Sequence, residues 1–122
     1  MAKILVMDDE EQMLTLYCDV LKAEGFNVLT ANNGKDGLNI AFRESPDLIL
    51  LDVMMPDKDG GQVVKELEAD NNAKNIPVIF LTSIITEEEV NAEKGKIGGR
   101  LYISKSSSPK EVVKKIKEVL HI

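Results

Sequence analysis

The stretch Pro46-Asp47-Leu48-Ile49-Leu50-Leu51-Asp52 decides the fold class of this 122-residue chain. Its four central residues are all apolar, and the run stops at an aspartate. A strand that is apolar on both faces is typical of the centre of a parallel sheet, because helices cover both sides of such a sheet. A second run, Ile4-Leu5-Val6-Met7, has the same character and also stops at an aspartate, Asp8. We therefore expect these two runs to be neighbouring central strands.

Strand-like and helix-like segments alternate along the rest of the chain. Further strands are expected over 26–30, 77–81 and 100–104, and helices where apolar residues recur at helical spacing. The helices are expected from about Met13 to a Gly25 terminator, over 35–43, from Asp59-Gly60 onward, in a weaker segment after Thr86 that Gly95, Gly98 and Gly99 cut short, and from Ser108-Pro109 onward. This alternation indicates an α/β domain, a doubly wound five-stranded parallel sheet with helices on both faces. Because 26–30 is more polar and suits an edge, we expect the strand order 2-1-3-4-5.

The composition limits the class of protein. Lys and Arg total 15 against 21 Asp and Glu, so the net charge is -6 and direct binding to nucleic acid or an anionic membrane is not expected. A single cysteine, Cys18, excludes an intrachain disulfide and suits a reducing compartment. The chain shows neither a signal-peptide pattern nor an apolar run near the roughly 20 residues that span a bilayer. We expect a cytoplasmic protein in which residues 1–122 form one domain, without a DNA-binding output domain.

Polar residues stand where four of the expected strands end. Asp8-Asp9 follow the first strand, Asp52 the third, Thr82 the fourth and Lys105 the fifth. The carboxyl ends of parallel strands meet at one edge of the sheet, where ligands bind at the switch in strand order. Neighbouring carboxylates repel each other, and Mg²⁺ suits such an all-oxygen site. A carboxylate nucleophile, a metal ion, an ammonium and a hydroxyl are together equipped for phosphoryl transfer to a carboxylate.

Each of these residues has a simpler explanation when it is taken alone. Asp8-Asp9 would more often cap the following helix, and Asp52 could begin a turn. Thr82 could fill a strand end, and Lys105 could be a solvated surface lysine. Their joint position at strand ends favours the functional interpretation over these separate explanations.

The chain resembles a response-regulator receiver domain of two-component signalling, and in particular the chemotaxis receivers. The matching motifs cover almost the whole chain: Ile4-Leu5-Val6-Met7-Asp8-Asp9-Glu10, Pro46 through Pro56, Asp59-Gly60, Pro77 through Ser83, and Tyr102-Ile103-Ser104-Lys105. The resemblance implies a flavodoxin-like fold. The expected strand order rests partly on this resemblance, because a chemotaxis receiver is a reference example of that order.

The resemblance implies a phosphoacceptor and a metal site. Asp52 stands where the family is phosphorylated. Asp9 stands where the family binds Mg²⁺ directly, and Asp8 where the family acts on the metal largely through water. The backbone carbonyl of Met54 falls where the family completes the coordination of the metal ion, with Asp52 as a further ligand.

The resemblance also implies a switch and a set of partners. Thr82 and Tyr102 match the two switch residues, and Lys105 matches the phosphate-binding lysine. The phosphoryl donor would be a sensor histidine kinase or a phosphotransfer protein. The fourth helix, fifth strand and last helix would form the face that binds a downstream protein target or a second copy of the chain. Such a domain is not an enzyme on another substrate, and catalyses only its own aspartyl phosphorylation and dephosphorylation.

One position departs from the family pattern. The family lysine is usually followed by a cis proline, whereas Lys105 is followed by Ser106. A cis bond before a residue other than proline costs about 3 kcal/mol. The bond is therefore expected either to keep that strained form or to be trans and to reposition the lysine. The missing proline keeps an alternative function open, a receiver that acts independently of phosphorylation as a docking or dimerisation module.

Two functions from other classes fit the sequence less well. A phosphatase of the haloacid dehalogenase type also uses an aspartate at a strand end, but it needs a second aspartate two residues later, where this chain has Met54. Binding of FMN is disfavoured because the acidic run 8–11 would repel the FMN phosphate. A glycine-rich phosphate loop is also missing from the sequence.

Overall fold

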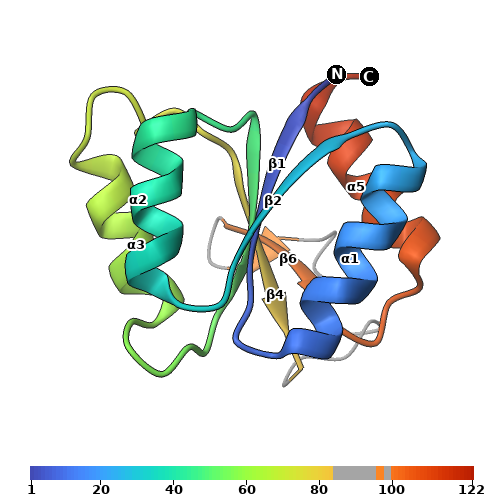
Figure 1. Cartoon of the computed structure of the whole chain (residues 1–122), viewed down its shortest axis with the longest axis horizontal. Helices are drawn as coiled ribbons and strands as arrows, with labels where there is room; N and C mark the ends of the chain where they lie inside the picture. The colour runs from blue at the N-terminus through green and yellow to red at the C-terminus, as the bar shows by residue number, and fades with distance from the viewer. Residues whose placement is uncertain (84–95, 98–99) are drawn as a thin grey trace.

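The chain folds as one mainly parallel sheet between two layers of helices (Figure 1). This computed structural model describes residues 1–83, 96–97 and 100–122. Its elements in chain order are β1 (Lys3–Met7), α1 (Glu11–Ala23), β2 (Asn27–Ala31), α2 (Gly34–Glu44), β3 (Leu48–Asp52), α3 (Gly60–Glu68), β4 (Val78–Thr82), β5 (Lys96–Ile97), β6 (Arg100–Ser104) and α5 (Pro109–Leu120). In Figure 1, α1 and α5 cover one face of the sheet, and α2 and α3 cover the other.

The strand order is β2-β1-β3-β4-β6-β5. The first five strands in this order are parallel, so the predicted order 2-1-3-4-5 is confirmed, with β6 as the fifth predicted strand. The structure adds β5, two residues that pair antiparallel with β6 at the edge of the sheet. This short strand was not predicted from the sequence. The predicted fourth helix, after Thr86, lies outside the described residues.

The core confirms that the two apolar runs are central strands. All four residues of each run, 4–7 and 48–51, are fully buried. Alternate side chains of these strands belong to two separate clusters, since Ile4 packs in the cluster that includes residues of α1 and α5, and Leu5 in the cluster that includes residues of α2 and α3. Both faces of the central strands are therefore covered by apolar side chains, as a doubly wound sheet requires.

The helix ends follow the signals in the sequence. Gly25 follows α1 with a φ of +92°, a backbone conformation that glycine adopts at the lowest cost. Asp59 forms a capping box with Gln62 at the start of α3. Ser108 accepts the Glu111 N–H at the start of α5. The caps of α3 and α5 determine where two of the loops at the carboxyl edge of the sheet end.

The loop between β3 and α3 is tied to α2 by Asp57. The Asp57 Oδ1 and Oδ2 atoms accept the N–H groups of Gly34, at 2.9 Å, and Lys35, at 3.0 Å. The first N–H groups of a helix have no partner within it, and the helix dipole favours a negative charge there. These two hydrogen bonds hold the pKa of Asp57 below its usual value. Asp57 therefore links the loop that follows Asp52 to a second element.

We expect Asp57→Asn to lower the free energy of unfolding by about 1 kcal/mol, because the amide keeps one acceptor oxygen and turns N–H donors toward the helix end. Urea unfolding at neutral pH measures this change. Asp19→Asn, an exposed position on α1, is the matched control and should change the free energy by less than about 0.5 kcal/mol. Equal changes for the two variants would show that the contacts of Asp57 do not stabilise the fold.

Candidate functional site

The predicted site residues meet at the carboxyl edge of the sheet. Asp52 is the last residue of β3 and Thr82 the last of β4, while Asp8 and Lys105 directly follow β1 and β6. A cavity of about 250 Å³ opens at this edge. Its lining residues are Asp9, Glu10, Asp52, Met54, Thr82, Ser83 and Lys105. The parallel register of the central strands brings these residues together from segments far apart in the chain.

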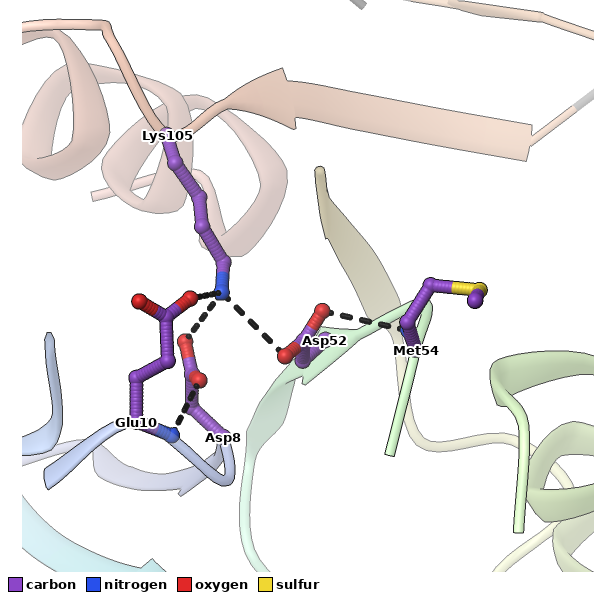
Figure 2. A network of polar contacts seen from close by, with 5 residues as sticks. All are labelled: Asp8, Glu10, Asp52, Met54 and Lys105. Carbon is purple, nitrogen blue, oxygen red and sulfur yellow. Dashed lines mark hydrogen bonds and ion pairs between the residues drawn. The ribbon is translucent and has the colours of Figure 1, made fainter. Parts of the chain in front are cut away.

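Lys105 is the centre of a network of carboxylates (Figure 2). Its Nζ lies 2.7 Å from Glu10 Oε1, 2.9 Å from Asp8 Oδ2 and 3.1 Å from Asp52 Oδ2. An ammonium group has three N–H donors. Those of Lys105 donate to Glu10 and Asp52, and its contact with Asp8 is an ion pair. Burial lowers the pKa of Lys105, but these carboxylates outweigh that effect and raise the pKa above its usual value. Lys105 is therefore a fixed positive charge inside the site.

Asp52 lies in an environment that disfavours its charged form. Its side chain is only 7% exposed, and Oδ1 accepts the Met54 N–H at 3.2 Å. The pKa of Asp52 is raised to about 6, mainly by burial and in addition by the negative charge of Asp8. The hydrogen bonds from Met54 and Lys105 offset these effects only in part. Additional positive charge near Asp52 would lower its pKa again and favour the ionised, nucleophilic form.

The carboxylates of this network suit a divalent cation. Oxygen atoms of Asp8, Glu10 and Asp52 lie within 4.8 Å of one another. Asp8 is fully buried, and its Oδ2, although 2.9 Å from Lys105 Nζ, accepts no hydrogen bond of good geometry from the described residues. Mg²⁺ prefers such oxygen ligands and fills its remaining positions with water. The residues present therefore fit a magnesium ion.

Glu10 is a site residue that was not predicted from the sequence. It is the N-cap residue of α1, yet its side chain makes no capping hydrogen bond and reaches Lys105 instead. The acidic cluster contains Glu10, whereas Asp9 is exposed and lines the cavity outside that cluster. In the sequence, the only signal for a role of Glu10 in the site was its position in the unbroken run Asp8-Asp9-Glu10. The metal-binding roles of Asp9 and of the Met54 carbonyl stay predictions.

The two predicted switch residues lie on adjacent strands. Thr82 is buried at the cavity wall. Tyr102 is half-buried and stacks on Phe80 of β4, with ring centroids 5.1 Å apart. Phe80 and Tyr102 are also direct cross-strand partners. The structure thus brings Thr82 to the site and places Tyr102 on β6, two residues before the strand ends at Ser104. The switching roles of Thr82 and Tyr102 stay predictions.

The peptide bond between Lys105 and Ser106 is trans, as are all the peptide bonds of the described residues. The Lys105 N–H donates to the Thr82 carbonyl at 2.8 Å, which continues the pairing of β4 with β6. Of the two expectations for this bond, the trans form is the observed one. The lysine head still lies within hydrogen-bond distance of Asp52.

Comparison with known proteins identifies the family of this chain. The family model described as the response regulator receiver domain matches residues 4–117. The chain belongs to this family. The relatives of this receiver domain include the alkaline phosphatase synthesis transcriptional regulatory protein PhoP of Bacillus subtilis, 40% identical over 119 residues, and protein PilH of Pseudomonas aeruginosa, 36% identical over 121 residues.

The relatives carry the receiver domain in chains of different length. The match covers 97% of this chain but 48% of PhoP, and 98% of both this chain and PilH. The chain thus spans about half the length of PhoP and of the phosphate regulon regulator PhoB of Escherichia coli. Among solved structures, Vibrio cholerae chemotaxis protein CheY4 is 28% identical with a TM-score of 0.83, each chain being covered to 98%.

A further solved structure is the receiver domain of a signal transduction histidine kinase from Syntrophus aciditrophicus. It is 25% identical, has a TM-score of 0.82 and is covered to 91%, with 99% of this chain matched. Within the described residues of this receiver domain, none of the helices has the length and apolar character needed to cross a bilayer. The family is a signalling family of two-component systems, and its members generally bind Mg²⁺.

Proposed function

We propose that Asp52 is the phosphoacceptor of this receiver domain, and that residues 1–122 form one such domain in the cytoplasm. The observation that carries the proposal is the pairing of Asp52 with Lys105 in the lining of a cavity, Oδ2 lying 3.1 Å from Nζ. The donor is a phosphohistidine of a sensor histidine kinase or of a phosphotransfer protein. The domain catalyses its own phosphorylation and dephosphorylation and acts on no other substrate.

The transfer step exchanges one bond to phosphorus for another. A carboxylate oxygen of Asp52 attacks the phosphorus atom, a P–O bond forms, and the P–N bond to the donor imidazole breaks. The imidazole leaves with the bonding electron pair. Lys105, which already contacts Asp52, donates a hydrogen bond to a phosphoryl oxygen, and the Thr82 hydroxyl at the cavity wall stabilises another. These residues orient the acyl phosphate and balance its negative charge.

We propose that Mg²⁺ binds to the carboxylates of Asp8, Asp9 and Asp52 and to the backbone carbonyl of Met54. Glu10, which the structure adds to the acidic cluster, is a further candidate ligand. When bound, the ion supplies positive charge that neutralises the phosphoryl oxygens in the transition state. The buried Asp8 carboxylate supports this assignment, because Lys105 is the one cation paired with it among the described residues.

The proposed output is a change in a protein-binding face. Thr82 and Tyr102 lie on the adjacent strands β4 and β6. In this proposal, movement of Thr82 toward a phosphoryl group is transmitted to the side of the domain formed by β6 and α5. That side, together with the predicted fourth helix, binds a downstream protein or a second copy of the chain. Direct binding to nucleic acid or membrane is not part of the proposal, because the net charge is -6.

The proposal is tested by incubating the protein with Mg²⁺ and acetyl phosphate and measuring the intact mass. We expect a gain of one phosphoryl group that a chelator prevents and that Asp52→Asn abolishes. Asp47→Asn is the matched control, because Asp47 precedes β3 at the opposite end of the same strand. A chain that gains no phosphoryl group, or whose modification survives Asp52→Asn, would instead support a phosphorylation-independent docking or dimerisation module.

A further inference from the structure

The serines on either side of Lys105 are joined through their side chains. Their hydroxyl oxygens lie 2.8 Å apart, and the Ser106 N–H donates to Ser104 Oγ at 3.2 Å. Ser104 is the last residue of β6 and only 2% exposed. The Ser107 N–H donates to the Ser104 carbonyl at 3.0 Å, which closes the turn. Ser104 thus accepts two hydrogen bonds from the two residues that follow Lys105 and pairs with a third polar group.

These contacts fix the backbone of Lys105 on both of its sides. On the side of β4, the Lys105 N–H is held by the Thr82 carbonyl. On the other side, the Ser104–Ser106 contacts constrain the residue that follows. A lysine side chain has many rotamers, and ordering them costs conformational entropy. A fixed backbone restricts the conformations of the lysine side chain, so the ammonium is held within reach of Asp52.

We propose that the Ser104–Ser106 hydroxyl pair is a positioning element that holds Lys105 in register with Asp52, and this inference rests on the proposed phosphoacceptor function. Neither serine contacts Asp52 in the described structure, so both act through Lys105. Ser106 stands at the position where the family usually has a proline. In this chain, side-chain hydrogen bonds across a trans peptide provide the local order.

The structure predicts a graded effect of substitution. Ser106→Ala removes the hydroxyl–hydroxyl contact but keeps the N–H bond to Ser104 Oγ, so the rate of phosphorylation by acetyl phosphate should fall about threefold. Ser104→Ala removes both contacts, and the rate should fall about tenfold, since small displacements of a catalytic group slow transfer strongly. Ser106→Thr keeps the hydroxyl and should restore the rate to within about twofold of the wild type. Ser107→Ala is the matched control, because no hydrogen bond of the Ser107 side chain is present among the described residues.

Mg²⁺ affinity separates positioning from a general structural defect. Lys105 positioning affects the phosphoryl group, so we expect the rate and the affinity for beryllofluoride to fall together while Mg²⁺ affinity, measured by calorimetry, changes less than about twofold. A parallel loss of Mg²⁺ affinity, or equal rates for Ser104→Ala, Ser106→Ala and Ser107→Ala, would overturn the inference. Failure of the proposed function itself is distinct, because then the wild-type protein would gain no phosphoryl group.

Discussion

Lys105→Met is expected to lower the free energy of unfolding of the metal-free domain by about 3 kcal/mol. Lys105 is the one cation that pairs with the site carboxylates in the described part of the chain, and its side chain is 8% exposed. Removal of one partner of a buried ion pair leaves an uncompensated charge, which costs about 3–5 kcal/mol. We expect the lower end of this range, because Glu10 is 58% exposed and water can solvate it.

Urea unfolding at neutral pH in the presence of a chelator measures this loss. Lys117→Met is the matched control, because Lys117 pairs with Glu24 at 3.2 Å on the surface, where an ion pair contributes less than about 1 kcal/mol. Saturating Mg²⁺ should restore much of the stability of Lys105→Met, since the ion binds the native state and supplies the missing positive charge. Similar losses for the two variants would show that the carboxylates do not depend on Lys105, and the absence of rescue by Mg²⁺ would show that the ion does not replace its charge.

The arrangement of the central strands was predictable because it depends on patterns that are local in the sequence. Apolar runs without alternation identify strands covered on both faces, and parallel strands align their carboxyl ends. Asp8, Asp52, Thr82 and Lys105 could therefore be assigned to one edge of the sheet from their positions alone. The strand order depended in part on the resemblance to receiver domains.

Other features depend on contacts that no local pattern records. The strand β5 has only two residues, too few for a periodic signal, and it exists as a partner of β6. The contact of Glu10 with Lys105 joins residues 95 positions apart. The serine contacts around Lys105 depend on side-chain orientations in a turn. In each case the residues come into contact only in the folded chain, so the sequence alone does not identify the partner.

Asp52→Asn is expected to stabilise the metal-free domain by about 2 kcal/mol near pH 7, although we also expect it to abolish phosphorylation. Burial raises the pKa of Asp52 to about 6 from 3.8. Between these two values the native state binds a proton that the unfolded state has released, so the contribution of Asp52 to stability falls as the pH rises. A shift of this size converts to about 3 kcal/mol. The asparagine amide has one acceptor oxygen, whereas the carboxylate accepts two hydrogen bonds, and this loss reduces the gain in stability.

The difference in stability between Asp52→Asn and wild type should therefore be small near pH 4, open as the pH rises to about 6, and stay constant above that. Urea unfolding at several pH values in a chelator measures it, with Asp19→Asn on the exposed face of α1 as the control that shows no such opening. Mg²⁺ should reverse the sign, because it binds the ionised carboxylate of the wild type and stabilises only that protein strongly. A difference in stability that is independent of both pH and Mg²⁺ would mean that ionised Asp52 does not destabilise the native state. It would also mean that the site does not use a cation to stabilise an ionised nucleophile.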